Sequence, residues 1–180
     1  MMHFALSTIY FLFCLAIIYG AICDVQTYTI PNYVSYGLMG LFVCYAGLVY
    51  FNTPTMPHLR FYITPILFNV AYGLIVFIFF VVFWKINWVG GGDVKFISAI
   101  SFFMGLQDVL IFVVLLSIIS VLMLAILKFI IFWNPYFRSG KLPEFLKNML
   151  LKLEDKAIPY GLPAALAALI VMPDVIAQHY

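Results

Sequence analysis

Two aspartates are the residues of this chain whose setting points most directly to chemistry. Asp93 follows the glycines 90–92 after a long apolar stretch, and Asp24 follows the first apolar stretch. A carboxylate at a membrane boundary is costly unless it has a task, although either one alone could simply mark where the chain leaves the membrane. Two carboxylates held close together cannot easily both ionise, so one serves as base toward water and the other as acid. The pair predicts aspartic peptidase chemistry that needs no metal ion and no other cofactor.

The other acidic residues and the cysteines indicate no second site. The remaining acidic residues lie in a basic loop or near predicted outward helix ends: Asp108, Glu144, Glu154, Asp155 and Asp174. The three cysteines form no C-x-x-C pair. Their odd number argues against a disulfide framework or a zinc site, so we expect Cys14, Cys23 and Cys44 to serve in packing.

The composition is that of an integral membrane protein. Of the 180 residues, 66% are hydrophobic and only 9% are charged, which lies far outside the range of soluble globular domains. No basic stretch stands free of apolar sequence, so the net charge of +2 does not indicate a nucleic-acid partner. The partner that the composition predicts is the lipid bilayer.

Apolar segments predict an all-α fold, a polytopic bundle of six transmembrane helices in a single domain over residues 1–180. The predicted helices are 4–22, 33–51, 62–84, 94–104, 109–133 and 158–177. A spanning helix needs about 20 apolar residues to cross a hydrocarbon core of roughly 30 Å. The segment 94–104 is shorter and contains Ser98, Ala99 and Ser101, small residues that allow close packing. We therefore expect its helix to be enclosed by its neighbours.

The distribution of Lys and Arg predicts the orientation of the bundle. Six spans place the joints 23–32, 85–95 and 134–157 on one side and both termini on the other. The first side carries Lys85, Lys95, Lys128, Arg138, Lys141, Lys147, Lys152 and Lys156, and the second carries Arg60. Because positive residues gather on the cytoplasmic side, we expect a multi-pass protein of the cell inner membrane with both termini outside. Asp24, just after the first helix, and Asp93, just before the fourth, then share the cytoplasmic face.

The predicted cytoplasmic joint 134–157 has an amphipathic pattern. Its apolar residues recur at helical spacing among lysines: Phe145, Leu146, Met149, Leu150 and Leu153. This pattern is typical of a helix that lies on the membrane surface with lysines toward anionic headgroups. The alternative is a surface that docks a substrate or a partner protein.

Helix ends also predict which aspartate holds the shared proton. Asp24 follows the C-terminus of the first predicted helix, where partial negative charge disfavours ionisation, and Asp93 precedes the N-terminus of the fourth, where free N–H groups favour it. We therefore expect Asp24 to be protonated and Asp93 to activate water. Lys95 could favour an ionised Asp93, or its side chain could reach the headgroups instead.

The order of several motifs resembles the type IV prepilin leader peptidases, which are membrane aspartic proteases with a G-x-G-D motif. The motifs that carry this resemblance are Asp24 with Thr29-Ile30-Pro31-Asn32, Gly90-x-Gly92-Asp93-Val94-Lys95, and Ile158-Pro159-Tyr160-Gly161-x-Pro163. The resemblance implies that Asp24 and Asp93 are the catalytic pair. It also implies that Gly90, Gly92, Lys95, Pro31, Asn32, Pro159 and Gly161 are motif or substrate-binding residues.

The resemblance further implies a substrate class. Bifunctional members of that family carry paired C-x-x-C zinc ligands after the first helix and also N-methylate the product, whereas this chain has only residues 25–32 there. It is more similar to the short members that process Flp-type pilins and to archaeal preflagellin peptidases. The implied partner is a pilin-like precursor with a basic cytoplasmic leader and an apolar helix, cleaved between the two without methylation. Pilus or secretion assembly components are possible further partners.

Three other functions remain open from the sequence. Presenilin-like and signal-peptide-peptidase-like proteases also use G-x-G-D, but they are larger and their first aspartate lies inside a helix. A small ion or proton transporter would need its carboxylates near mid-membrane. A structural subunit of a pilus assembly complex would tolerate Asp24→Asn and Asp93→Asn.

Overall fold

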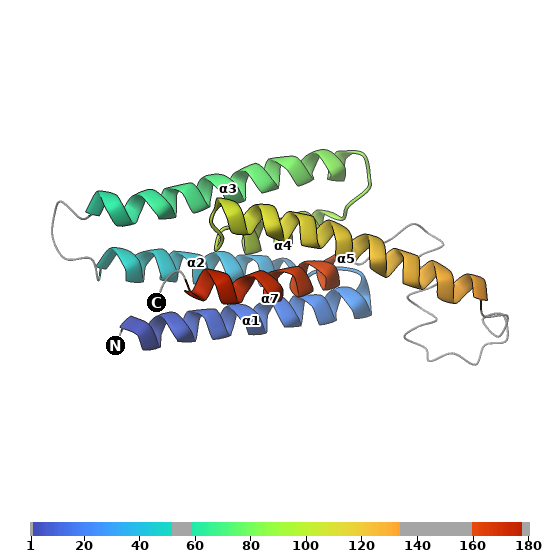
Figure 1. Cartoon of the computed structure of the whole chain (residues 1–180), viewed down its shortest axis with the longest axis horizontal. Helices are drawn as coiled ribbons and strands as arrows, with labels where there is room; N and C mark the ends of the chain where they lie inside the picture. The colour runs from blue at the N-terminus through green and yellow to red at the C-terminus, as the bar shows by residue number, and fades with distance from the viewer. Residues whose placement is uncertain (1, 52–58, 134–159, 178–180) are drawn as a thin grey trace.

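The computed structural model describes residues 2–51, 59–133 and 160–177, and the regular structure within these ranges is entirely α-helical (Figure 1). The helices are α1 Met2–Thr27, α2 Asn32–Phe51, α3 Leu59–Lys85, α4 Gly91–Ser101, α5 Leu106–Trp133 and α7 Gly161–Ala177. The predicted all-α class is therefore confirmed for the described residues. The amphipathic segment 134–157 and Pro159 lie outside them.

Four helices are long and apolar enough to cross a membrane. The spans are Phe4–Thr27, Asn32–Phe51, Ile66–Lys85 and Leu106–Phe129. Large apolar side chains cover their outer faces, such as Phe11, Ile78 and Val121, each more than 60% exposed. Such a surface is stable in lipid rather than in water. A multi-pass membrane protein follows, while the spanning of the membrane by α4 and α7 stays a prediction.

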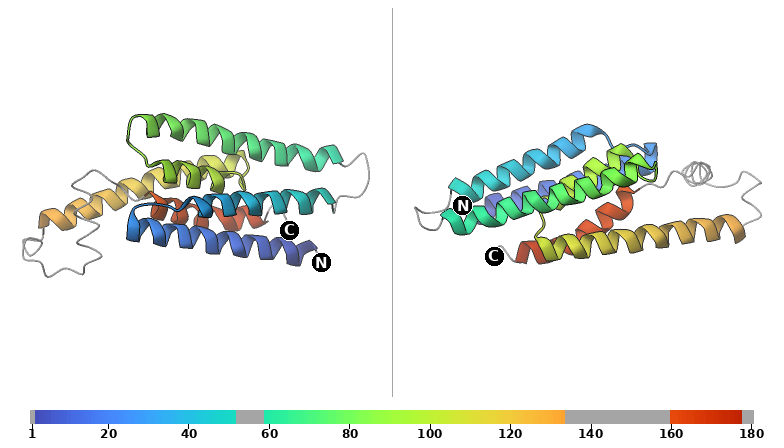
Figure 2. Two further views of the ribbon diagram at one scale, coloured as in Figure 1. Left: turned by 180° about the vertical axis from the view of Figure 1, so that it is seen from behind. Right: turned by 90° about the horizontal axis from the view of Figure 1, so that it is seen from above.

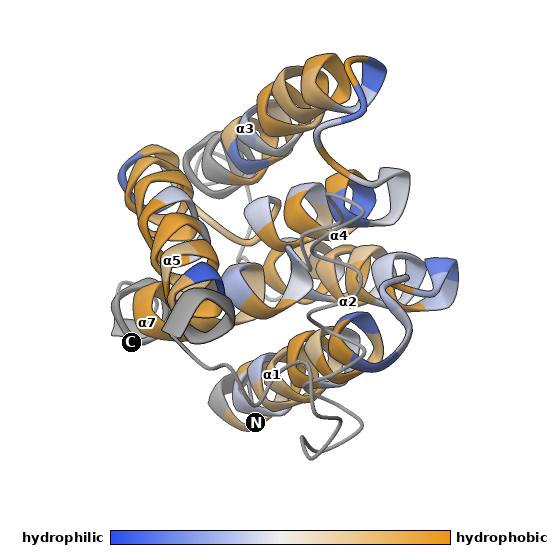
Figure 3. Cartoon of the chain, turned by 90° about the vertical axis from the view of Figure 1, so that its right-hand side faces the viewer, coloured by the Kyte–Doolittle hydropathy of each residue, from blue (hydrophilic) through white to orange (hydrophobic). Residues whose placement is uncertain are grey.

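The short helix α4 is enclosed, as its length and small residues predicted. It packs against α3, α2 and α7, and Figures 2 and 3 show it among the longer helices. Residues 96–101 are almost fully buried. The hydroxyls of Ser98 and Ser101 donate to the carbonyl oxygens of Val94 and Ile97 at 2.7 and 2.9 Å, so burial leaves neither hydroxyl without a partner.

Two glycines on the neighbouring helices make room for the aromatic side chains of α4 and the residue after it. A Cβ atom at Gly20 of α1 would lie 2.7 Å from the ring of Phe96, and one at Gly73 of α3 would lie 2.7 Å from the ring of Phe102. Both distances are far below van der Waals contact. Gly20 therefore leaves room on α1 for the ring of Phe96, and Gly73 lets α3 lie close to Phe102.

Two helix ends differ from the predicted boundaries, which were wrong at the positions that matter most. The first helix continues to Thr27 rather than ending at residue 22, and α4 begins at Gly91 rather than at residue 94. Asp24 thus lies in the last turn of α1, and Asp93 lies in the first turn of α4. Hydropathy marks where the apolar segment ends, whereas a helix ends where its backbone is capped.

The cap of α1 is Tyr28. Its φ of 54° is left-handed, and its N–H donates to the carbonyl oxygen of Asp24 at 2.7 Å. This is the αL type of helix end, which glycine usually provides, so no residue type in the sequence announced it.

The ends of the helices that carry the aspartates meet on one side of the molecule. Figure 1 shows the end of α1, the start of α2, the end of α3 and the start of α7 at the same end of the bundle. Residues 28–31 alone connect α1 to α2, so these two helices are antiparallel neighbours. The orientation of this end toward the cytoplasm stays a prediction.

Candidate active site

Asp24 is buried at the junction of α1 and α7. Its side chain is only 2% exposed, and its Oδ2 accepts a hydrogen bond of 2.6 Å from the backbone N–H of Gly161. Gly161 is the first residue of α7, where N–H groups lack partners within the helix and partial positive charge gathers. The Asp24 carboxyl therefore occupies the position at a helix N-terminus that favours a negative charge.

Gly161 must be a glycine for this contact to exist. A Cβ atom at this position would lie 2.8 Å from both Oδ2 and Cβ of Asp24. The sequence predicted Gly161 as a motif or substrate-binding residue without naming its partner. The structure makes it a hydrogen-bond donor to the first aspartate.

Asp93 is the third residue of α4 and is also buried, with 9% exposure. Its Oδ2 accepts a hydrogen bond of 3.3 Å from the N–H of Gly90, the residue that precedes the helix. This is one of the two hydrogen bonds of a capping box, the one in which the side chain of the third helical residue binds the N–H of the N-cap residue. The length of the bond makes it weak. A Cβ atom at Gly90 would lie 2.8 Å from the same Oδ2, so Gly90 leaves the space that the carboxyl occupies.

Within the glycine run, Gly92 lies close to the backbone of another segment of the same chain. A Cβ atom at Gly92 would lie 3.2 Å from the carbonyl oxygen of Ile30, in the connection between α1 and α2. Gly92 therefore lets the start of α4 pack tightly against the segment that follows Asp24. The space beside Gly92 is filled by this segment and is not available to a substrate backbone. Gly90, in contrast, is exposed.

Asp24 and Asp93 interact electrostatically. Burial, followed by the charge of Asp24, raises the pKa of Asp93, and the hydrogen bond from Gly90 opposes this shift only in part. The structure thus brings together two carboxyls that lie far apart in the sequence.

The hydrogen bonds favour the reverse of the expected proton order. Asp24 has the short bond from a helix N-terminus, whereas Asp93 has the long bond, and the charge of Asp24 adds to burial in raising the pKa of Asp93. The prediction considered the end of α1 beside Asp24, but it did not include the start of α7. We infer that Asp93 holds the shared proton and Asp24 carries the charge.

The other motif residues connect α4 to α2. Lys95 donates from Nζ to Oδ1 of Asn32 at 3.0 Å, and both side chains are exposed. Pro31, just before α2, accepts a hydrogen bond of 3.0 Å at its carbonyl oxygen from the N–H of Val34. Lys95 thus ties the start of α4 to the start of α2.

Two tyrosines beside the aspartates were not predicted as site residues from the sequence. Burial, and then the charge of Asp24, raises the pKa of Tyr28. Burial, and then the charge of Asp93, raises the pKa of Tyr160. Tyr160 lies within the third motif and Tyr28 four residues after Asp24, but an aromatic residue in an apolar chain carries no signal of its own.

In the part of the chain that the structure describes, no three His, Cys, Asp or Glu residues gather where they could hold a metal ion. A sequence profile of the type IV leader peptidase family matches residues 11–133, a range that contains both aspartates. No curated protein and no solved structure matches the chain. Because the profile covers more than half of the 180 residues, the chain belongs to the type IV leader peptidase family.

Proposed function

We propose that this protein is a membrane aspartic endopeptidase in which Asp24 and Asp93 cut the basic leader from a type IV prepilin-like precursor of the Flp type. One observation carries the proposal. Two buried carboxyls on different helices interact at the same end of an apolar bundle. Structural ion sites also bury aspartates, but a coupled pair beside a helix N-terminus is suited to acid and base catalysis.

The proposed reaction uses both carboxyls twice. Ionised Asp24 takes a proton from water as the water oxygen attacks the scissile carbonyl carbon, and protonated Asp93 gives its proton to the carbonyl oxygen. In the tetrahedral diol that results, Asp93 takes back a hydroxyl proton. Asp24 then protonates the departing amine as the C–N bond breaks. The products are a carboxylic acid and an amine, and both aspartates return to their starting states.

The position of the pair favours peptidase over transport chemistry. Both aspartates belong to terminal turns of their helices, Asp24 three residues before the end of α1 and Asp93 in the first turn of α4. A transport relay needs carboxyls near the middle of the membrane. Cleavage between a cytoplasmic leader and an apolar helix needs them near the boundary instead. The proposed site thus lies at the cytoplasmic face of the inner membrane.

We also propose that the enzyme does not methylate its product. In the bifunctional relatives the segment after the first helix carries the zinc-binding cysteines. Here residues 28–31 alone connect α1 to α2, and this connection packs against Gly92 through Ile30. This connection is too short to form a separate zinc-binding unit.

The decisive experiment is the mass of the pilin N-terminus after incubation of purified protein with a Flp-type precursor and S-adenosylmethionine. We expect a cleaved product without an added methyl group. Asp24→Asn and Asp93→Asn should each lower cleavage by at least about 10³-fold while the protein stays folded, because each carboxyl is needed in both steps.

Asp108→Asn is the matched control. Asp108 is 5% exposed and is the third residue of α5, as Asp93 is of α4. It lies beyond the other end of α4 and should keep full activity. Cleavage that survives in Asp24→Asn would remove this residue from the mechanism. Two silent Asp→Asn variants would favour a structural subunit of a pilus assembly complex.

A further inference from the structure

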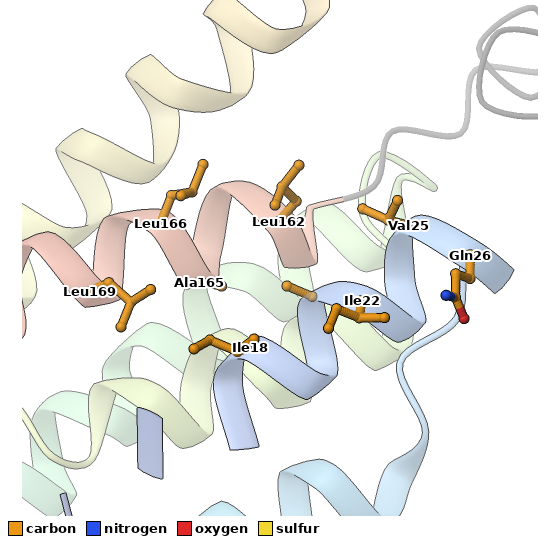
Figure 4. Close-up of a pocket in the computed structure, with 9 residues that line it drawn as sticks. Ile18, Ile22, Val25, Gln26, Leu162, Ala165, Leu166 and Leu169 are labelled. Atoms are coloured by element: carbon orange, nitrogen blue, oxygen red, sulfur yellow. The ribbon is translucent and has the colours of Figure 1, made fainter. Parts of the chain in front are cut away.

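An apolar groove runs between α1 and α7 beside the candidate active site (Figure 4). Its volume is about 420 Å³. Ala21 of α1 and Ala165 of α7 form its floor, since both are almost fully buried and contribute only a methyl group. Ile22 and Leu166 form opposite walls and are 48% and 43% exposed, so the groove opens outward.

The groove ends beside the residues of the candidate active site. Val25 and Leu162 line it, and they directly follow Asp24 and Gly161, whose hydrogen bond joins the two helices. Ala21 on the floor lies one turn before Asp24. One end of the groove therefore lies at the level of Asp24 along α1.

The length and polarity of the groove select the kind of molecule that fits. From Ile18 to Gln26 it follows α1 for about 12 Å, at 1.5 Å per residue. Among the described residues that line it, Gln26 at the active-site end is the one polar residue, and aliphatic side chains line the rest. A furrow between two packed helices is the surface into which the side chains of a third helix fit. The suitable occupant is an apolar helix.

We propose that this groove docks the apolar helix of the precursor, in the turns that directly follow the scissile bond. This inference rests on the proposed function, which requires a substrate with a polar leader joined to an apolar helix. Docking here places the junction of leader and helix at the level of Asp24. The proposed reaction does not require a lipid chain or a second copy of this chain to lie at this level, whereas it does require the substrate's junction to lie there.

A crosslinking experiment tests which molecule occupies the groove. A photoreactive phenylalanine replaces Ile22 or Leu166 in the uncleaving Asp93→Asn protein, reconstituted with precursor in vesicles. Ile118 on α5 and Ile170 on α7 are control positions outside the groove, 49% and 57% exposed. We expect precursor adducts from the two groove positions and none from the controls. Adducts only with lipid or with a second copy of the chain, or equal precursor adducts at all four positions, would overturn the proposal.

A kinetic experiment separates this inference from the proposed function. Ile22→Trp and Leu166→Trp narrow the groove, and we expect each to raise the KM for the precursor by at least roughly tenfold. Ile118→Trp, at a position of nearly the same exposure, should leave the KM unchanged. If the unaltered protein does not cleave the precursor, the proposed function fails. If all three variants cleave with unchanged KM, the docking site alone fails.

Discussion

Gly161 is the residue that connects the first aspartate to the last described helix. Its N–H binds Asp24, and no larger residue fits beside that carboxyl. We predict that Gly161→Ala lowers cleavage on the order of 10²-fold, because the added methyl group pushes the Asp24 carboxyl out of place and small displacements of catalytic groups are costly. Cleavage of the Flp-type precursor by purified variants measures this.

Gly47→Ala is the control for this change. A Cβ atom at Gly47 meets nothing within 4 Å, so the variant should cleave normally. The effect at Gly161 should appear in the turnover of bound precursor and not in the amount of folded protein. Normal turnover in Gly161→Ala would show that the contact with Asp24 is not needed for catalysis.

The raised pKa of Asp93 predicts the pH dependence of cleavage. Burial and the charge of Asp24 keep Asp93 protonated well above the usual range of a carboxyl. The proposed reaction needs that proton, so we expect the rate to fall as pH rises through the raised pKa of Asp93. The rate should also fall in acid, where Asp24 becomes protonated and no base remains. A pH–rate profile under single-turnover conditions should be bell-shaped.

The profile reports the pair, so a second measurement assigns the proton. Infrared difference spectra of protein with isotope-labelled aspartate, recorded also for Asp24→Asn and Asp93→Asn, should place the protonated carboxyl on Asp93 at neutral pH. A protonated Asp24 beside an ionised Asp93 would restore the order that the helix ends predicted from sequence. A rate that keeps rising in alkali would show that no acid is required.

At the scale of helices, the enclosed helix α4 positions Asp93, and Gly20 allows it to do so. Phe96 lies one turn after Asp93, is fully buried, and fills the space that a Cβ atom at Gly20 would need. We predict that Gly20→Ala destabilises the protein by roughly 1–3 kcal/mol, as overpacking of a tight interior does. Cleavage should fall as well, because α4 moves away from α1. Thermal unfolding in detergent and precursor cleavage measure the two effects.

Gly40→Ala on α2 is the matched substitution. No atom lies within 4 Å of a Cβ atom at Gly40, so neither stability nor activity should fall. Equal stability and equal cleavage in Gly20→Ala and Gly40→Ala would mean that α4 tolerates displacement, and that the packing of Phe96 against α1 does not set the position of Asp93.

At the scale of the whole molecule, the Lys and Arg asymmetry predicts that the catalytic end faces the cytoplasm. Single cysteines at Thr27 and Ile86, near the ends of α1 and α3, should react with an impermeant thiol reagent only after cells are opened. Cysteines at Phe4 and Phe51, at the other ends of α1 and α2, should react in intact cells. All four positions are exposed, and Cys14, Cys23 and Cys44 are replaced by serine beforehand.

The opposite pattern of labelling would place the active site outside and contradict a cytoplasmic leader. Labelling of Thr27 and Phe4 from the same side would contradict the spanning of the membrane by α1. The outer faces of α1, α2, α3 and α5 are mostly apolar, which is why each of these helices is expected to cross the membrane.

The sequence by itself determined the class of the protein and the approximate places of its helices, and it predicted two aspartates as the candidate catalytic pair. These features depend on local properties, namely apolar length, composition and charged residues at apolar boundaries. The enclosure of α4 was also predictable, because its shortness and its serines leave little apolar surface for lipid. The helix ends at Asp24 and Asp93 were not, since Tyr28 caps α1 in a conformation that the sequence does not announce.

Only the tertiary structure decided how the aspartates are held. Gly161 lies 137 residues after Asp24, so its hydrogen bond depends on the packing of α7 against α1. The start of α7 beside Asp24, the close approach of Gly92 to Ile30 and the groove beside the site all arise from the same packing. Proton order depends on these contacts because burial and hydrogen bonds at a carboxyl come from every element around it, whereas sequence shows only the element that carries it.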